Sequence, residues 1–562
     1  MAKRVVIIGG RGGGAVCAAR LRRLDESADI TLVEREAAPF FEKCGLPYSL
    51  EEFSRTASPT HETWRQHFRI DLLTSTETLR IERERKEVEV RNVESGKTQR
   101  LPYDLLVLSP RAVPMPLSVE GAGLPGVFTL TAPDALPQLS DWLATRQGAL
   151  RRAAVIGAGG LGLAAAEALI ARGLETTLID GCLQILPAML DREMAALLEE
   201  PLVARGLTLR LGAHLGRIRS DPSGQGLSIE SFEPAVPHIG ADVIVLSLGT
   251  VPNADLARGA GLDVSPSSGG IRVDGNFKTS DPDIFAVGDV IEAPARLSEG
   301  RERLAIAGTS DHQARRLASI LHYRDVSYVG SLRTSIVERF GAAGARVGLS
   351  EREARLLGIA HRAAWYPDST GDGAGGLLAL KVIFSTADGR VLGGQVIGHS
   401  NALCGVERRI DVLATALAGR MSVYDLELVE LAYAPTSEHS GPTRDAINQL
   451  GSIAVGILRG NHPSIGWDEL PAARQSGAFL IDVRTPEEFA QGSIPGAVNI
   501  PFESLRQRLG EVPHGRRIIS FCQSGKHGYK ATRILLQNGF DVVNLLGGYL
   551  MFEGAGNPIG IA

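Results

Sequence analysis

The sequence predicts an α/β protein with two dinucleotide-binding domains, a following α+β domain and a small α/β domain at the C-terminal end. A pattern of apolar strand, glycine-rich turn and helix occurs twice, in "RVVIIGGRGGGAVCAARLRRL" and in "AAVIGAGGLGLAAAEALIARG". Near the C-terminus a cysteine, Cys522, stands directly between an apolar strand and a helix. Since 562 residues are too many for one hydrophobic core, we expect these patterns to belong to separate domains.

Composition narrows the classes of function. The formal net charge of −5 gives no reason to expect a nucleic acid or an anionic membrane as partner. No apolar run approaches the length of a membrane span, and the N-terminus enters a strand instead of a cleavable signal, so we expect a cytoplasmic protein. The cysteines are far apart and form no CxxC motif, so neither a disulfide framework nor a metal site is expected. They are Cys17, Cys44, Cys182, Cys404 and Cys522.

The first strand, turn and helix are followed by a second strand, "DITLVERE", that ends in Glu34. In this Rossmann-like layout the glycines let the backbone approach a pyrophosphate at the helix N-terminus, and the acidic residue binds a ribose hydroxyl. The spacing departs from the usual fingerprint because Arg11 replaces the middle glycine. The second strand and Glu34 still favour a nucleotide site over a simple tight loop. The glycines of this turn are Gly9, Gly10, Gly12, Gly13 and Gly14.

The second occurrence has the complete spacing, Gly157, Gly159 and Gly162, and its second strand ends in Asp180. Two dinucleotide folds in one chain indicate electron transfer between two dinucleotides. Because the carboxylate of Asp180 would repel a 2′-phosphate, we expect the second site to prefer NADH to NADPH.

The remaining sequence completes these folds and adds two further domains. From about Tyr328, strands and helices without glycine turns indicate an α+β domain ending near Gly451, and residues 452–464 are expected to be a linker. The segments "AFLIDVRTPEEF" and "RRIISFCQSGKHGYKATRILLQ" then predict the small α/β domain. The predicted domains are residues 1–115 with 272–327, 116–271, 328–451 and 465–562.

Several motifs, in this order along the chain, carry a family resemblance. The segments "FEKCGLPYSL", "TSDPDIFAVGDV", "RIDVLATALAGRMSVYDL" and "ELAYAP" resemble the coenzyme A disulfide reductase branch of the pyridine nucleotide disulfide reductases. The tail, with "DVRTPEEFAQGSIPGAVNIP" and "CQSGKHGYKA", is similar to rhodanese domains. The order matches fused enzymes described as NADH-dependent persulfide or polysulfide reductases. The resemblance implies an FAD-binding domain (1–115 and 272–327), an NADH-binding domain (116–271), a homodimerisation domain (328–451) and a rhodanese domain (465–562).

The resemblance makes Cys44 the redox-active nucleophile above the flavin. One cysteine is enough in this branch because the substrate, a small persulfide, polysulfide or disulfide, supplies the second sulfur of a mixed disulfide. A thiol needs a lowered pKa to attack at neutral pH, which a flavin ring or a helix N-terminus would supply. The resemblance also places Tyr366 beside this thiol and Tyr433 in the other subunit's active site. We expect the other cysteines outside the rhodanese loop to be structural.

The resemblance further implies the residues that contact FAD and NADH. They are Gly9, Gly10, Gly13, Gly14, Glu34, Arg35, Lys43, Ser109, Pro110, Gly157, Gly159, Gly162, Asp180, Gly249, Gly288 and Asp289. Arg20 and Arg23, on the helix after the first turn, match positions that meet the phosphates of coenzyme A. The alternative for these two arginines is a solvated helix face.

Cys522 is a second reactive site of a different kind. The loop after it curls before the next helix, so backbone N–H groups and the helix dipole point at the sulfur, an arrangement that suits a thiolate or a persulfide. The candidate substrate contacts are Gln523, Ser524, Gly525, Lys526, His527 and Gly528. His527 stands where rhodaneses often have arginine, which leaves the sulfur donor open.

Departures from the family pattern keep two other functions in view. Lys43, Arg111 and Ala164 replace the usual asparagine, glycine and glutamate, and the lysine expected near Gly441 is missing. One alternative is an NADH oxidase or peroxidase with a sulfenic acid at Cys44, although those relatives carry a histidine where this chain has Gly12. The other is a degenerate flavoprotein that acts as a sulfur carrier or redox sensor.

Overall fold

The computed structural model describes residues 3–37, 61–116, 119–130, 135–146, 148–221, 226–232, 238–323, 327–369, 376–399, 404–432 and 445–554. The chain forms two compact units. The first comprises residues 1–157, 161–181 and 213–333, and the second comprises 158–160, 182–212 and 334–562. The finer boundaries between four domains stay a prediction.

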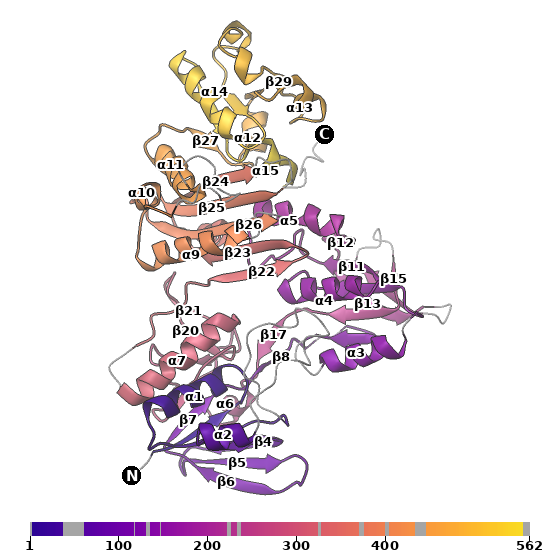
Figure 1. Cartoon of the computed structure of the whole chain (residues 1–562), viewed down its shortest axis with the longest axis vertical. Helices are drawn as coiled ribbons and strands as arrows, with labels where there is room; N and C mark the ends of the chain where they lie inside the picture. Colours follow the sequence, from indigo (N-terminus) through magenta and orange to yellow (C-terminus); the bar gives the residue numbers. More distant parts are fainter. Residues whose placement is uncertain are drawn as a thin grey trace. The chain divides into compact units, whose positions relative to one another are not determined.

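The first nucleotide fold is a parallel sheet with the strand order β19-β7-β1-β2-β3. β1 pairs in parallel with both β2 and β7, and four of its five residues are buried, which is typical of a strand covered on both faces. Helices α1 and α7 lie side by side (Figure 1). The elements are β1 (Arg4–Ile8), α1 (Gly13–Leu24), β2 (Asp29–Val33), α2 (His61–His67), β3 (Asp71–Leu73), β7 (Leu105–Leu108), β19 (Ile284–Ala286) and α7 (Ala307–Tyr323).

The second nucleotide fold repeats this arrangement. β10 pairs in parallel with β11 on one side and with β16 on the other, and β16 pairs with β9. The chain again passes from strand to turn to helix to neighbouring strand, as the repeated sequence pattern predicts. The elements are β9 (Val127–Thr129), α3 (Ala135–Thr145), β10 (Arg152–Ile156), α4 (Gly160–Ala171), β11 (Glu175–Asp180) and β16 (Val243–Leu246).

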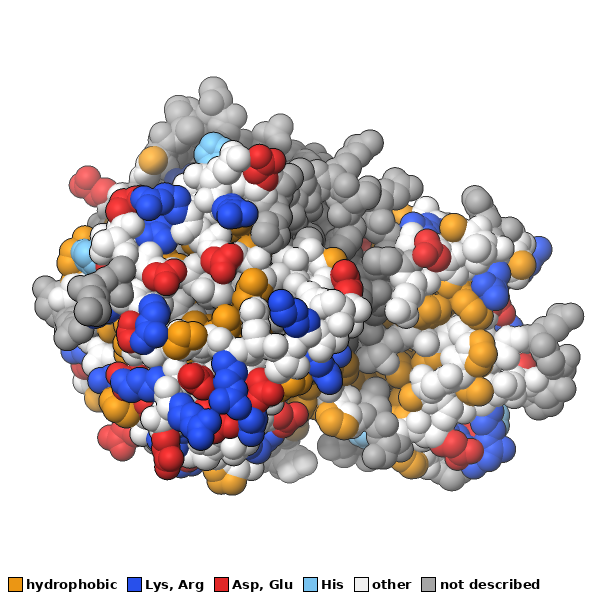
Figure 2. All heavy atoms as spheres, turned by 90° about the horizontal axis from the view of Figure 1, so that it is seen from below, with side chains coloured by type: hydrophobic (Ala, Val, Ile, Leu, Met, Phe, Trp, Pro, Cys, Tyr) orange, Lys and Arg blue, Asp and Glu red, His pale blue; other side chains and the backbone are white. Residues whose placement is uncertain are grey.

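Smaller sheets and one short helix complete the first unit. On the sheet β4-β5-β6, Arg80 pairs with Glu89 at 2.5 Å and Arg91 with Glu77 at 2.8 Å. Figure 2 shows acidic and basic side chains interspersed in this way over one face. The elements are β4 (Thr76–Glu82), β5 (Glu87–Asn92), β6 (Thr98–Pro102), β8 (Ala112–Pro114), β13 (Leu215–Ser220), β14 (Leu227–Ser231), β15 (Ile239–Ala241), β17 (Thr250–Pro252), α6 (Asp255–Gly259), β18 (Ile271–Arg272), β20 (Ile291–Pro294) and β21 (Arg301–Glu302).

The second unit contains an antiparallel sheet with the order β22-β23-β26-β25-β24. β23 and β25 are buried along their whole length, because α5 and α9 pack on β26 and β23 while α11 packs on β24 and β25. The elements are α5 (Arg192–Ala204), β12 (Leu207–Leu211), β22 (Ser335–Arg339), β23 (Ala342–Gly348), α8 (Glu351–Leu356), β24 (His361–Ser369), β25 (Leu377–Ser385), β26 (Val391–His399), α9 (Cys404–Ala418), α10 (Val423–Leu428) and α11 (Ala446–Leu458).

The last part of the second unit is a parallel sheet with the order β27-β31-β30-β28-β29. α11 continues to Leu458, so it includes the first part of the segment 452–464 that the sequence predicts to be a linker. The elements are β27 (Ser464–Ile465), α12 (Leu470–Gln475), β28 (Phe479–Asp482), α13 (Pro486–Ala490), β29 (Val498–Asn499), two 3-10 helices (Phe502–Ser504 and Leu509–Glu511), β30 (Ile518–Phe521), α14 (Lys526–Gln537), β31 (Val542–Leu545) and α15 (Gly548–Gly554).

These sheets confirm the predicted fold class. Both nucleotide folds, the α+β domain and the small C-terminal α/β domain are present in the order that the sequence indicates. Among the described residues, no helix has the length and apolar character needed to cross a membrane.

Candidate cofactor and sulfur sites

The turn between β1 and α1 depends on two glycines at which a side chain would not fit. A Cβ at Gly9 would lie 2.2 Å from the carbonyl oxygen of Ser109, and a Cβ at Gly14 would lie 1.8 Å from the carbonyl oxygen of Gly9. The φ of Gly9 is +99°, in the region that favours glycine. This close packing brings the backbone near any anion bound at the N-terminus of α1, which begins at Gly13.

The turn between β10 and α4 has the same two contacts. A Cβ at Gly157 would lie 2.2 Å from the carbonyl oxygen of Ser247, and one at Gly162 would lie 1.8 Å from the carbonyl oxygen of Gly157. Around Gly159 and Gly249 a Cβ would meet no atom within 4 Å. Asp180, the last residue of β11, is half-buried.

Glu34 lies directly after β2 and is only 5% exposed. Its carboxylate accepts hydrogen bonds from the backbone N–H groups of Gly10 at 2.7 Å and Glu36 at 3.0 Å. Glu34 and Arg35 line a cavity of about 530 Å³ that also reaches Gly9 and Pro110. A carboxylate fixed in this way is placed to accept hydrogen bonds from the hydroxyls of a ribose.

Asp289 lies in a neighbouring cavity of about 580 Å³. The hydroxyl of Ser310 donates to its carboxylate at 2.9 Å. Burial raises the pKa of Asp289, while this hydrogen bond and the charges of Arg303 and Arg111 act in the opposite direction. The cavity is also lined by Arg11, Gly12, Gly13, Ser109, Pro110, Arg111 and Gly288.

The residues of these two cavities fit a large dinucleotide such as FAD. The glycine turn leaves room for a pyrophosphate, Glu34 is oriented for a ribose, and Arg11 and Arg111 supply positive charge beside the turn. The two arginines that the sequence singles out as departures therefore line the same cavity as the predicted FAD contacts Gly288 and Asp289.

Arg20 and Arg23 both lie on α1, the first half-buried and the second exposed. Arg22, between them, is buried and donates hydrogen bonds to the carbonyl oxygens of Phe68 and Arg69. Arg22 thus has a structural role, and the predicted contact of Arg20 and Arg23 with coenzyme A phosphates stays a prediction.

Three predicted site residues, Lys43, Cys44 and Tyr433, lie outside the described residues. Of the other cysteines, Cys17 is fully buried, and burial raises the pKa of its thiol to about 12. Such a thiol carries almost no thiolate at neutral pH, in keeping with the structural role that the sequence predicts. Cys182 is exposed.

Cys522 follows the last residue of β30 and is 4% exposed. The loop after it ends at Gly525, the N-cap residue of α14, which has a φ of +87°. The backbone N–H of Tyr549 donates to the carbonyl oxygen of Cys522 at 2.9 Å, and that of Leu550 donates to the carbonyl oxygen of Gln523 at 3.0 Å. These bonds fix the loop at the N-terminus of α14.

Arg484 supports this loop and was not among the predicted site residues. It is buried, pairs with Asp482 at 2.8 Å, and donates from Nη1 to the side-chain oxygen of Gln523 at 3.0 Å. Its guanidinium also lies 4.2 Å from the ring centroid of Tyr549. The sequence does contain a signal for this residue. Asp482 and Arg484 in "IDVR" are two opposite charges at the end of β28, which pairs with β30.

Two of the predicted substrate contacts, Lys526 and His527, lie against aromatic rings. The ring of His527 stacks on Phe502 with centroids 5.1 Å apart, and Nζ of Lys526 lies 4.8 Å from the ring centroid of Tyr366. Ser524 lies in the loop, and Gly528 lies inside α14, where a Cβ would be 3.1 Å from the Cα of Phe521. The structure thus brings Tyr366 to the Cys522 loop, and its predicted role at Cys44 stays a prediction.

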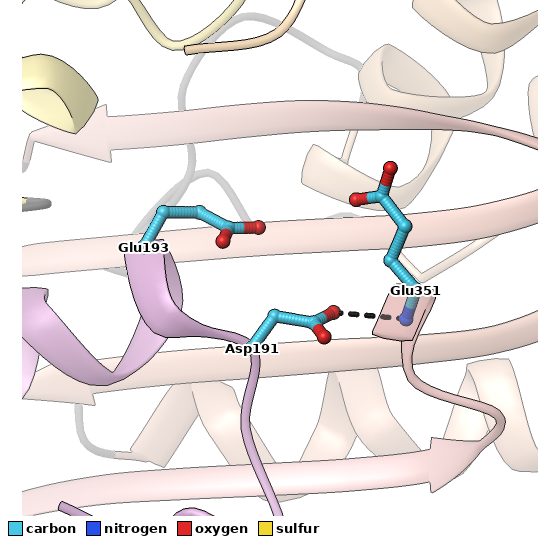
Figure 3. Close-up of side chains that lie close together, drawn as sticks. All are labelled: Asp191, Glu193 and Glu351. Atoms are coloured by element: carbon cyan, nitrogen blue, oxygen red, sulfur yellow. Dashed lines mark hydrogen bonds between the residues drawn. The ribbon is translucent and has the colours of Figure 1, made fainter. Parts of the chain in front are cut away.

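One group of acidic side chains has the arrangement of a metal site but holds a lysine. The carboxylates of Asp191, Glu193 and Glu351 converge to within 4.8 Å of one another (Figure 3). Nζ of the fully buried Lys381 lies 2.8, 2.5 and 2.8 Å from them. Burial alone would lower the pKa of Lys381, but these three charges outweigh it and raise that pKa. The ammonium group therefore lies where a metal ion would otherwise bind, and its ion pairs link α5, α8 and β25.

Comparison with known proteins agrees with this fold. A family model described as pyridine nucleotide-disulphide oxidoreductase matches residues 3–311, and one described as rhodanese-like domain matches residues 467–555. A coenzyme A disulfide reductase of Staphylococcus haemolyticus is 27% identical over 461 residues, which are 80% of this chain and 98% of the relative.

Two solved structures match nearly the whole chain. Reduced Bacillus anthracis CoADR-RHD is 33% identical with a TM-score of 0.91, and the match covers 99% of this chain and 98% of that one. An NAD-dependent persulfide reductase from A. fulgidus is 30% identical with a TM-score of 0.87, and the match covers 98% of this chain and 100% of that one. The chain therefore belongs to the pyridine nucleotide-disulphide oxidoreductase family and carries a rhodanese-like domain at its C-terminal end.

Proposed function

We propose that this protein is an NADH-dependent flavoenzyme that reduces persulfides, polysulfides or coenzyme A disulfide at Cys44 and transfers sulfane sulfur at Cys522. The observation that carries the proposal is the combination, in one chain, of two matching dinucleotide turns with a cysteine fixed at the N-terminus of α14. The names of the relatives, a coenzyme A disulfide reductase and a persulfide reductase, support the same substrate class.

Membership of the family implies FAD and NAD(H) as cofactors. Gly9, Gly14, Glu34 and Asp289 would hold FAD, and Gly157, Gly162 and Asp180 would hold NADH. A flavin held there supplies two-electron transfer between a reduced nicotinamide and a disulfide.

In the proposed reaction the thiolate of Cys44 attacks the inner sulfur of a persulfide R–S–SH. The new bond gives the mixed disulfide Cys44–S–S–R, and hydrosulfide leaves with the electron pair of the broken S–S bond. Two electrons from NADH and one proton then return the thiolate of Cys44 and the thiol RSH. With a symmetric disulfide the same attack releases RS⁻ instead of hydrosulfide.

The proposal has three further parts. Coenzyme A is the carrier thiol, the protein is a homodimer in which Tyr433 lies in the other subunit's site, and its location is cytoplasmic. The basic side chains of Arg20 and Arg23 on α1 support the first of them, because the phosphates of coenzyme A are anionic. The histidine typical of NADH oxidases and peroxidases is absent from the first turn, where the chain has Gly12.

The proposal is tested by steady-state NADH oxidation under anaerobic conditions. Coenzyme A persulfide, coenzyme A disulfide, glutathione persulfide and inorganic polysulfide are compared as substrates of the wild-type protein and of Cys44→Ser. We expect turnover with at least one of them and loss of that turnover in Cys44→Ser, since serine cannot form the mixed disulfide. Substantial turnover by the variant would refute the role of Cys44.

A further inference from the structure

The second unit contains a cavity of about 510 Å³ whose lining does not include Cys522. One wall comes from β24 and α11, which supply Trp365 and Ile453, and the other from the rhodanese-like domain, which supplies Lys526 and Lys530. The size is typical of a small-molecule site. Its wall includes Ser524 and Gly525 of the loop after Cys522 and Lys526 of α14, so an occupant would lie beside that loop.

The charged side chains that line this cavity are all basic. They are Arg409, Lys526 and Lys530, and none of the lining residues that the structure describes is an aspartate or glutamate. Arg409 pairs with Asp445 at 2.8 Å, whereas Lys526 and Lys530 are exposed. His462 adds no charge, because burial lowers its pKa to about 4. This excess of positive charge favours an anion.

Two buried polar atoms in the cavity wall have hydrogen-bonding capacity that the described part of the chain does not use. They are Nε of Arg409, a donor, and Oδ1 of Asn544, an acceptor. The two residues are 5% and 1% exposed. Since unpaired buried polar groups are costly, a ligand that accepts a hydrogen bond from Nε of Arg409 would be favoured.

The rest of the wall is largely apolar or aromatic. Trp365, Ile453 and Leu546 lie in it together with the ring of Tyr529. A free inorganic anion would leave this surface uncovered, whereas an apolar body attached to the anionic group would bury it. The wall is therefore complementary to a molecule with one anionic end and one flat, apolar end.

We propose that this cavity binds an organic oxyanion, a phosphate or carboxylate attached to an aromatic or apolar body. The anionic group lies at Lys526 and Lys530, and the body lies against Trp365 and Ile453. Neither Cys522 nor any residue of the two dinucleotide turns is among its lining residues. The inference does not depend on the proposed reaction.

The experiment is a calorimetric titration of the full-length protein, with FAD bound and NAD⁺ at saturation so that the dinucleotide sites are filled. Phenyl phosphate is the probe, and phenol, inorganic phosphate and benzoate are titrated separately. We expect one phenyl phosphate per chain, bound at least about tenfold more tightly than phenol or inorganic phosphate. The affinity for benzoate then tells whether the site prefers a phosphate or a carboxylate.

Two variants locate the site. Lys530→Gln removes one positive charge and Ile453→Phe adds bulk to the wall, and each should weaken phenyl phosphate binding by about tenfold. Arg506→Gln is the matched control, because Arg506 is an exposed basic residue of the same domain and does not line the cavity. Absence of phenyl phosphate binding, unchanged affinity in both variants, or equal affinity for inorganic phosphate would overturn the proposal.

Discussion

The glycine turns before α1 and before α4 have the same backbone contacts but different side chains around them. In both, the first glycine packs against a serine carbonyl and the last packs against the first, with identical closest distances for an added Cβ. Around the first turn lie the buried Glu34 and the side chains of Arg11 and Arg111. Around the second lie the half-buried Asp180 and the open space at Gly159 and Gly249.

This difference between the two turns distinguishes two properties of a nucleotide site: how closely the ligand can approach, which depends on the backbone, and which ligand is preferred, which depends on the side chains. The backbone contacts set how closely a pyrophosphate can approach, so they are the same in both folds. We expect the side chains to determine which dinucleotide binds, because arginines add positive charge at the first turn and the carboxylate of Asp180 would repel a 2′-phosphate at the second. The proposed function therefore has FAD at the first turn and NADH at the second, and the variants below test that proposal.

The largest expected effect is the loss of bound flavin, which should occur when the first turn is changed but not when the second is. We expect Gly14→Ala to lose nearly all bound flavin, because its Cβ would lie 1.8 Å from the carbonyl oxygen of Gly9. Gly162→Ala makes the same clash in the second turn and should retain flavin while losing its reduction by NADH. Flavin absorbance per mole of protein and its bleaching by NADH are the measurements.

Gly123→Ala serves as the control for this pair, because Gly123 is exposed and a Cβ there would meet no atom within 4 Å. It should match the wild type in both measurements. Full flavin content in Gly14→Ala, or loss of flavin in Gly162→Ala, would contradict the assignment of the turns.

The next largest effect should fall on sulfurtransfer by the rhodanese-like domain and leave the reaction of the nucleotide folds intact. Cys522→Ser should lower thiosulfate or polysulfide sulfurtransfer at least about a hundredfold, because serine cannot hold a sulfane sulfur. NADH-dependent reduction of a small disulfide should stay close to the wild-type rate. If the variant equals the wild type with every sulfane substrate, the two cysteines do not act in one reaction sequence.

A smaller effect concerns cofactor preference at the second turn. The wild-type kcat/KM for NADH should exceed that for NADPH, and Asp180→Ala should reduce this ratio by about tenfold or more, since it removes the repulsion of the 2′-phosphate. Glu34→Ala is the paired variant and should leave the ratio unchanged. Equal efficiencies of the two cofactors in the wild type would show that Asp180 does not meet the 2′ position.

The smallest effect lies in the second unit, outside both turns. Burial, and then the charge of Arg533, lower the pKa of His462 to about 4. Because the folded pKa lies below the ordinary value near 6.5, His462 stabilises the fold above pH 6.5, and this contribution is lost as the pH falls towards 4. The unfolding temperature of the wild type should fall between pH 7 and pH 5, and in His462→Gln this fall should be smaller by about a few degrees. An identical drop in both proteins, measured by scanning calorimetry, would refute this.

The features that the sequence predicts well are local ones. Each glycine turn and the Cys522 loop occupy a few consecutive residues between a strand and a helix, so spacing alone indicates their geometry. Glu34 and Asp180 belong to the same local pattern, because Glu34 directly follows β2 and Asp180 is the last residue of β11. Cys44 and Tyr433 were also predicted from motifs, but they lie outside the described residues.

The features that were missed depend on contacts between distant segments. The carboxylates around Lys381 come from positions 191, 193 and 351, and no periodicity connects those positions with residue 381. Arg484 reaches Gln523 across 39 residues, and Tyr366 meets Lys526 only because β24 lies beside the rhodanese-like domain within the second unit. Such contacts follow from the packing of complete elements, which a single sequence does not specify.

The most direct test of the central claim is an anaerobic titration of the purified protein followed by its flavin absorbance. We expect a flavin spectrum that NADH bleaches and that coenzyme A persulfide, coenzyme A disulfide or polysulfide restores, with sulfide released from the persulfide and polysulfide substrates. A protein without flavin absorbance, or a bleached flavin that only oxygen restores, would contradict it.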